Sequence, residues 1–210
     1  MVRLYLVRHG TTNAIEQHLM QGASDSPLSA RGREEAKLTA ESLKNEGIKT
    51  AFSSPMGRAR ETADILCELL DLNYRVIHDL HEIDFGIYEG REYFSVPDEN
   101  SGVFKRIGLL GRILIAQITG ESLSHVSRRA RRTWEAITSE IQNGKVMVIS
   151  HGVFINYLTK YLLPKAEFDK IKPVQTHPCS ITELKVPFAG QAEISRLNDI
   201  SHLKNSSTPD

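Results

Sequence analysis

The stretch V-R-L-Y-L-V-R-H-G-T, residues 2–11, indicates both an α/β fold and a ligand site. Its first six residues are an extended, β-prone run, and an Arg-His pair and a glycine follow directly. In open α/β sheets, ligands bind just beyond the carboxyl ends of the strands. Arg8 would offer a fixed positive charge to an oxyanion there, and Gly10 would let backbone N–H groups approach a ligand. We therefore expect the edge of a sheet to present His9, although a strand that ends in R-H-G without any function is the simple alternative.

Strand-like and helix-like segments alternate along the rest of the chain, which is the pattern of a layered α/β domain. The sequence predicts strands at 2–7, 49–52, 74–77 and 146–150, helices at about 29–47, 56–70, 122–141 and 153–163, and an edge hairpin of strands at 180–186 and 193–197. We expect residues 1–203 to form one domain and residues 204–210 to form a flexible polar tail.

The less regular stretch 91–119 is predicted to be a helical insertion over one edge of the sheet. It contains one apolar helix candidate, at 104–118, in which three basic residues are interspersed. Two interpretations of this segment stay open: a lid over a substrate, or a helix packed on the core or on a second copy of the chain.

Composition excludes several classes of partner. Hydrophobic residues make up 40% of the chain and the formal net charge is zero, so we expect a packed core and no global attraction to nucleic acid or to an anionic membrane. The basic run 128–132 lies mid-helix and is interpreted as a solvated helix face. Cys67 and Cys179 match no zinc or redox spacing, and the N-terminus lacks the layout of a signal peptide, so we expect a cytoplasmic protein.

A second histidine follows a strand in the same way as the first. The segment I-S-H-G, residues 149–152, ends a buried apolar run and precedes a helix. A lone histidine at a strand end is more often structural, but parallel strands place their carboxyl ends at one edge of the sheet. We therefore expect His9 and His151, distant in the chain, to meet in one crevice.

Charged residues at the other strand ends point to the same edge. Arg58 is predicted in the first turn of a helix, where a cation is unfavourable unless an anion is bound nearby, whereas Arg60 is interpreted as solvated. Glu82 and Asp84 follow the third predicted strand. A carboxyl group close to two histidines and two arginines is a credible general acid.

Together these motifs resemble the histidine phosphatase superfamily, in the branch that includes cofactor-dependent phosphoglycerate mutases and their phosphatase relatives. The matching segments are V-R-H-G at 7–10, S-S-P-M-G-R-A at 53–59, L-H-E-I-D-F-G-I-Y-E-G at 80–90, G-E-S at 120–122 and S-H-G at 150–152. They occur in the family's order. The resemblance implies a three-layer α/β/α sandwich with a largely parallel central sheet.

The resemblance also implies a role for each residue. His9 matches the nucleophile that becomes phosphorylated, Glu82 matches the proton donor, with Asp84 as its competitor, and His151 matches a catalytic residue of the phosphate pocket. The remaining candidates for phosphate binding are Arg8, Arg58, Asn13, Gln21 and Gly22. Two positions depart from the family pattern: Thr11 replaces the frequent Glu or Gln, and Ile15 replaces the usual Asn, so that Asn13 either substitutes for that contact or leaves it unmade.

The expected activity is hydrolysis of a small phosphorylated metabolite through a phosphohistidine, with no metal and no other cofactor, by a monomer or homodimer. Two alternatives are a phosphoglycerate mutase and a binding module that kept the pocket without the chemistry. Residues 91–119 contain a single proline, Pro97, unlike the proline-rich insertion of the mutases, and G-I-Y-E-G at 86–90 resembles the phosphatase branch. These features favour the phosphatase.

Overall fold

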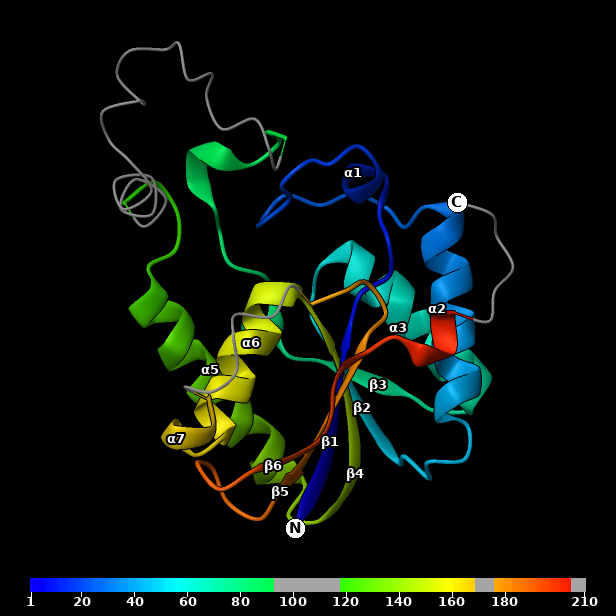
Figure 1. Cartoon of the computed structure of the whole chain (residues 1–210), viewed down its shortest axis with the longest axis vertical. Coiled ribbons are helices and arrows are strands. Elements are labelled where there is room, and N and C mark those ends of the chain that lie inside the picture. The colour runs from blue at the N-terminus through cyan, green and yellow to red at the C-terminus, as the bar shows by residue number, and fades with distance from the viewer. Residues whose placement is uncertain (93–117, 169–175, 205–210) are drawn as a thin grey trace.

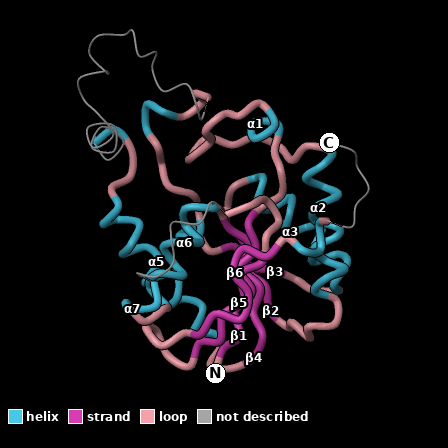
Figure 2. Tube along the Cα trace, viewed as in Figure 1, coloured by secondary structure: helices cyan, strands magenta, loops and turns pink. Residues whose placement is uncertain are grey.

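The computed structural model describes residues 1–92, 118–168 and 176–204 (Figure 1). The described residues form a six-stranded sheet in the order β3-β2-β4-β1-β5-β6. The strands are β1 (Val2–Arg8), β2 (Thr50–Ser53), β3 (Tyr74–Val76), β4 (Gly144–Ser150), β5 (Ile181–Val186) and β6 (Glu193–Asp199). Strands β3, β2, β4 and β1 are parallel, and β5 and β6 add an antiparallel hairpin at one edge (Figure 2). The predicted sheet, largely parallel with an edge hairpin, is confirmed.

Helices cover both faces of the sheet, which gives the three layers that the resemblance implies (Figure 1). The helices are α1 (Asn13–Glu16), α2 (Ala30–Leu43), α3 (Gly57–Leu70), α5 (Leu123–Glu140), α6 (Gly152–Leu162) and α7 (Lys165–Phe168), with short 3₁₀ turns at His78–Leu80, Gly86–Tyr88 and Ser201–Leu203. Helices α2 and α3 lie on one face, and α5 and α6 lie on the other.

Strand β1 explains why its sequence is apolar at almost every position. Leu4 and Leu6 pack in the core that α5 and α6 cover, while Tyr5 and Val7 pack in the core under α2 and α3. A strand that is buried on both faces reads as a continuous apolar run rather than as an alternating one. Its carboxyl end therefore emerges from the middle of the molecule.

Two close-packed glycines fix helix α2 to the turn that follows β1. Ser29 caps α2 as predicted, because its hydroxyl accepts a hydrogen bond from the Gly32 N–H at 3.2 Å. A Cβ at Gly32 would lie 1.9 Å from the Thr11 carbonyl oxygen, and one at Gly10 would lie 2.5 Å from the Gly32 carbonyl oxygen. The turn after His9 thus packs directly on the backbone of α2.

Helix α2 ends at Leu43, earlier than the predicted boundary near Gly47. The Glu46 N–H donates to the Leu43 carbonyl, so the chain already turns there, and Gly47 takes a φ of 68°. The helix predicted at 104–118 and the insertion at 91–119 fall almost wholly outside the described residues, as does the tail from 205 onward. None of the described helices has the length and apolar character that a bilayer crossing requires.

The basic run on α5 departs from its prediction at one residue. Arg128, Arg131 and Arg132 are exposed, but Arg129 is fully buried. It forms an ion pair with Glu121, with 2.6 Å between Nη2 and Oε2. The interpretation of this run as a solvated face is therefore wrong for Arg129, because this position shares the inner face of the helix with Val126 and Thr133.

Candidate active site

Three strand ends converge at one edge of the sheet. Strands β1 and β4 pair in parallel so that Arg8 lies opposite Ser150, and the His9 N–H donates to the Ser150 carbonyl at 3.0 Å. On the other side of β4, the Ser54 N–H donates to the Ile149 carbonyl, also at 3.0 Å. The backbone ladder therefore brings the residues after β1, β4 and β2 together, as expected for parallel strands.

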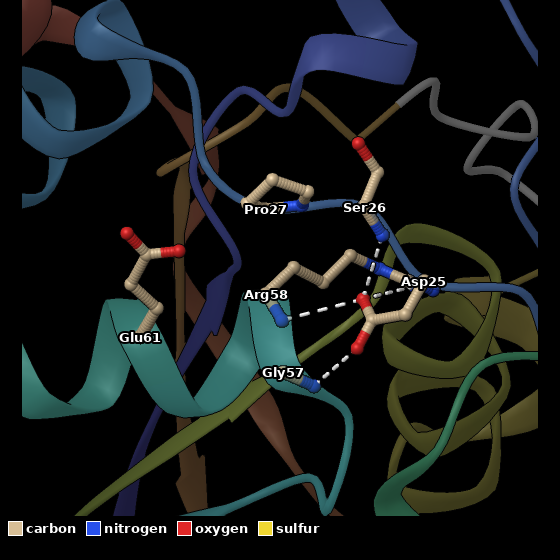
Figure 3. Close-up of a pocket in the computed structure, with 6 residues that line it drawn as sticks. All are labelled: Asp25, Ser26, Pro27, Gly57, Arg58 and Glu61. Atoms are coloured by element: carbon tan, nitrogen blue, oxygen red, sulfur yellow. Dashed lines mark hydrogen bonds and ion pairs between the residues drawn. The ribbon is translucent and has the colours of Figure 1, made fainter.

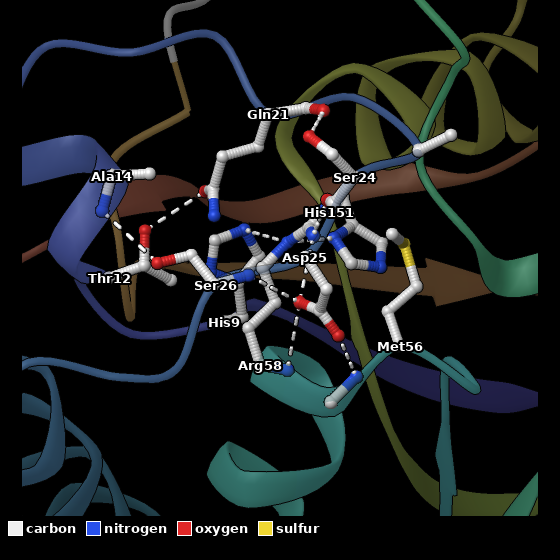
Figure 4. Close-up of polar contacts among 12 residues, drawn as sticks. His9, Thr12, Ala14, Gln21, Ser24, Asp25, Ser26, Met56, Arg58 and His151 are labelled. Carbon is white, nitrogen blue, oxygen red and sulfur yellow. Dashed lines mark hydrogen bonds and ion pairs between the residues drawn. The ribbon is translucent and has the colours of Figure 1, made fainter. Parts of the chain in front are cut away.

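The two imidazoles that follow β1 and β4 are buried neighbours (Figure 4). The ring centroids of His9 and His151 lie 5.1 Å apart, at an angle of 57°. Arg58 lies against both rings, because its Nε is 3.3 Å from His9 Nε2 and 3.2 Å from His151 Nδ1. Sequence reasoning expected these three side chains to meet, and they do.

The hydrogen bonds assign a neutral state to both rings. His9 Nδ1 lies 2.8 Å from the Gly10 carbonyl oxygen, which only accepts, so the proton is on Nδ1, and the Nε2 lone pair accepts from Arg58 Nε. His151 Nε2 pairs with the Ser54 hydroxyl at 2.7 Å, and its Nδ1 accepts from Arg58. Burial, and then the Arg58 guanidinium, lower the pKa of each histidine well below its usual value.

These lowered pKa values predict a stability that falls in acid. Below about pH 6.5, His9 and His151 become protonated in the unfolded protein but stay neutral in the folded protein. The free energy of unfolding therefore decreases as the pH is lowered, by up to about 1.4 kcal/mol per pH unit for each ring. In the His9→Asn variant, we expect the slope of the free energy of unfolding against pH, between pH 6.5 and 5, to be smaller by the contribution of about one proton. Urea unfolding at several pH values measures it. Equal slopes for wild type and His9→Asn would contradict the assignment.

The buried Arg58 guanidinium is held by a loop between α1 and α2. Its Nη2 donates to the Gly22 carbonyl at 2.8 Å, and its Nη1 donates to the Ser24 carbonyl at 2.7 Å and to Asp25 Oδ1 at 3.0 Å. The Asp25 carboxylate also accepts from the backbone N–H groups of Gly57 and Arg58 (Figure 3). A cation in the first turn of a helix is unfavourable unless an anion lies nearby. For Arg58, the protein itself supplies part of this negative charge through Asp25.

A pocket of about 310 Å³ opens at this same helix start (Figure 3). Its lining consists of Asp25, Ser26, Pro27, Gly57, Arg58 and Glu61. Glu61 also accepts hydrogen bonds from the Leu28 N–H and from Arg33. The pocket is therefore lined by the Asp25–Arg58 pair and by one further carboxylate, that of Glu61.

Two buried donors near the histidines have no hydrogen-bond partner in the described part of the chain: Arg8 Nε and Gln21 Nε2. Arg8 is anchored through Nη1 to the Thr176 carbonyl at 2.5 Å. Gln21 is anchored through Oε1, which accepts from Thr12 Oγ1 at 2.9 Å, and its amide points toward His9 (Figure 4). Because buried donors are almost always paired in native proteins, these two are available to an acceptor, either a water molecule or a polar ligand.

Glu82 lies at the beginning of α6, the helix that follows His151. Its Oε2 accepts from the Val153 N–H at 3.1 Å, and its Oε1 accepts from the N–H groups of Phe154 and Ile83 at 3.0 and 2.9 Å. Asp84, its competitor as general acid, instead binds the Gly86 N–H of its own loop at 2.6 Å. The geometry thus ties Glu82, and not Asp84, to the helix that carries the second imidazole.

Two weaker candidates take other positions. Asn13 begins α1 with an exposed side chain, and its backbone N–H donates to the Pro27 carbonyl. Gly22 turns its carbonyl, not its N–H, toward Arg58, and a Cβ there would collide with Glu89 Oε1 at 2.2 Å. The phosphate contacts of these residues stay a prediction, and the contact that Gly22 makes here serves to hold Arg58.

Sequence reasoning gave no role to several polar residues that support the site. Ser54 was within a quoted motif, and its position directly after β2 is the signal that could have found it. Glu35 binds the N–H and hydroxyl of Thr11, both at 2.9 Å, and Thr62 accepts from the Gly10 N–H at 3.1 Å. Glu35 and Thr62 lie on α2 and α3, and the sequence around them gives no sign that their side chains contact the turn after β1.

Comparison with known proteins places these features in a family. A model of the histidine phosphatase superfamily (branch 1) matches residues 4–200. A probable phosphoglycerate mutase, GpmB of Salmonella paratyphi A, is 29% identical over 97% of this chain and 95% of its own.

Solved structures of both activities resemble the fold. The phosphoglycerate mutase of Bacillus anthracis is 26% identical, with a TM-score of 0.77 over 97% of this chain and 95% of that one. A mycobacterial glucosyl-3-phosphoglycerate phosphatase in complex with VO3 is 25% identical, with a TM-score of 0.76 over 93% of this chain and 98% of that one.

Proposed function

Because this chain belongs to branch 1 of the histidine phosphatase superfamily, whose matching members are phosphatases and mutases, we propose that it is a phosphomonoesterase for a small phosphorylated metabolite. The observation that carries this proposal is the buried pair of neutral imidazoles, His9 and His151, that share the Nε of Arg58. A neutral imidazole carries a lone pair that can attack phosphorus, and a guanidinium beside it binds phosphoryl oxygens.

In the first step, the lone pair of His9 Nε2 attacks phosphorus and forms an N–P bond, while the P–O bond to the leaving group breaks. The leaving oxygen takes a proton from the Glu82 carboxyl group and departs as an alcohol. Arg8, Arg58 and the Gln21 amide offer N–H donors to the phosphoryl oxygens, and the charges of the two guanidiniums balance that of the dianion. This role accounts for the two unpaired buried donors.

In the second step, the Glu82 carboxylate takes a proton from a water molecule, and the water oxygen attacks phosphorus. The N–P bond breaks, His9 regains its lone pair, and inorganic phosphate leaves. Glu82 is protonated again, so the cycle closes without a change in the enzyme. No step in this scheme calls on a metal ion.

A phosphoglycerate mutase is the second candidate, because the relatives of this chain include proteins named as such. Both activities use the same phosphoenzyme and differ in what receives the phosphoryl group. The single proline in residues 91–119 and the segment G-I-Y-E-G at 86–90 support transfer to water.

The proposal predicts hydrolysis of p-nitrophenyl phosphate that persists in excess EDTA. Release of p-nitrophenol and of phosphate measures it, and a panel of phosphorylated metabolites then ranks the substrates. With 3-phosphoglycerate, phosphate release should exceed the formation of 2-phosphoglycerate. The reverse order would identify a mutase, loss of activity in EDTA would contradict the metal-free scheme, and no turnover of any phosphomonoester would leave the binding module.

A further inference from the structure

Arg129 is the one arginine of the basic run that the protein core encloses. Burial of a guanidinium is costly unless every donor is paired. Glu121 receives two of its hydrogen bonds, from Nε to Oε1 at 2.9 Å and from Nη2 to Oε2 at 2.6 Å. The remaining N–H groups of Arg129 donate to backbone carbonyls of the segment that includes Glu82.

The carbonyls that Arg129 binds belong to the segment 79–82. Its Nη1 donates to the Asp79 carbonyl at 2.7 Å and to the His81 carbonyl at 2.6 Å, and its Nη2 is 3.5 Å from the Glu82 carbonyl. The planar, rigid guanidinium of Arg129 thus fixes the backbone conformation at Glu82, the proposed proton donor, and at the residues just before it.

Arg129 also contacts the helix that receives the Glu82 carboxylate. Its guanidinium carbon lies 4.5 Å from the centroid of the Phe154 ring, and the Phe154 N–H donates to Glu82 Oε1. The backbone of Glu82 and the first turn of α6 are therefore held by the same side chain, from two directions.

Glu121 connects this clamp to the start of α5. Its backbone N–H donates to the Asp84 carbonyl at 2.9 Å, and its carboxylate compensates the buried charge of Arg129. Gly120, just before it, packs so closely on Asp84 that a Cβ would lie 2.2 Å from the Asp84 carbonyl oxygen. The segment 79–84 is thus held at one end by the Arg129 side chain and at the other by the backbone of Gly120 and Glu121.

We propose that Arg129 and Glu121 are positioning residues that hold the Glu82 carboxyl group at the leaving-group oxygen. This inference rests on the proposed function, in which Glu82 protonates that oxygen. It separates these two residues from the rest of the core, because their loss should affect proton donation and not the attack by His9.

Leaving groups of different basicity test the inference. p-Nitrophenolate departs without protonation, whereas the alkoxide of glycerol 2-phosphate does not. In the Arg129→Lys variant we expect kcat/KM for glycerol 2-phosphate to fall about 100-fold, and that for p-nitrophenyl phosphate to fall less than about threefold. The kcat/KM ratio is the right measure because it covers the step in which the leaving group departs.

A double variant shows whether Arg129 acts through Glu82. Once Glu82→Gln has removed the proton donor, adding Arg129→Lys should cost little more, since the two changes disable one function. The Glu121→Gln variant should likewise lower kcat/KM far more for glycerol 2-phosphate than for p-nitrophenyl phosphate. It replaces Arg129→Lys in this test if that variant does not fold. Arg132→Lys is the matched control, because Arg132 binds the side chain of Asp79 from the exposed side of α5 and should leave both esters within about twofold.

The outcomes separate this inference from the proposed function. An active wild type in which Arg129→Lys and Glu121→Gln lower both esters equally, or in which the losses multiply with that of Glu82→Gln, would overturn the positioning role alone. A wild type that hydrolyses neither ester would overturn the proposed function, and this inference with it.

Discussion

Replacement of His9 by alanine is expected to lower kcat for phosphomonoesters by at least about 10⁴-fold, because no other described side chain offers an imidazole lone pair at the same place. His151 cannot substitute, since its Nε2 is already paired with the Ser54 hydroxyl at 2.7 Å. The remaining guanidiniums would still bind substrate, so KM should change far less than kcat.

A phosphoenzyme trap makes this result specific. Rapid quenching of the wild type with a ³²P-labelled substrate should yield protein-bound label that is stable in alkali and labile in acid, as a phosphohistidine is. The His9→Ala protein should yield none, while the exposed control His18→Asn should label like the wild type. Label that persists in His9→Ala would place the nucleophile elsewhere.

Replacement of Arg58 is expected to produce the second largest loss. The Arg58→Lys variant keeps the charge but loses the planar fork that joins both imidazoles to the loop at residues 22–25, so kcat/KM should fall about 10²–10³-fold. Binding of orthovanadate should weaken in parallel, because an anion that resembles the transition state depends on the same donors.

Arg60 provides the control for this experiment. It lies one half-turn further along α3, is exposed, and should tolerate lysine with kcat/KM within about twofold of the wild type. Arg58→Lys should also be less stable to urea, since the carbonyls of the buried Gly22 and of Ser24 lose their donors. Full activity and full vanadate affinity in Arg58→Lys would remove Arg58 from the phosphate site.

The sequence predicts well those features that follow from hydrophobic periodicity along the chain, or from the rule that parallel strands end at the same edge of a sheet. The apolar runs of β1 and β4 identify buried strands, and Ser29 identifies the start of α2. The convergence of His9 and His151 follows from the rule that parallel strands share a carboxyl edge. None of these predictions needs knowledge of how side chains pack.

The parts that escaped prediction depend on contacts between distant segments. Asp25 lies in a loop of ordinary polar composition, and only its docking on α3 shows that it binds Arg58. Arg129 was judged together with its charged neighbours, although its spacing of three and four residues from Val126 and Thr133 places it on the inner face. Spacing alone could have corrected that interpretation, but it could not have identified the carbonyls that Arg129 binds.

The pairing of Arg8 with Ser150 has a consequence for how this chain tolerates evolutionary change. The separation of the His9 and His151 rings follows from this main-chain pairing, which does not depend on the side chains of the strands. A residue deleted from the middle of β4 would instead shift the ladder by one step and turn the ring of His151 toward the opposite layer. An insertion or deletion within β4 is therefore expected to disrupt the His9–His151 arrangement, whereas a change of length in the connecting loops leaves this strand pairing intact.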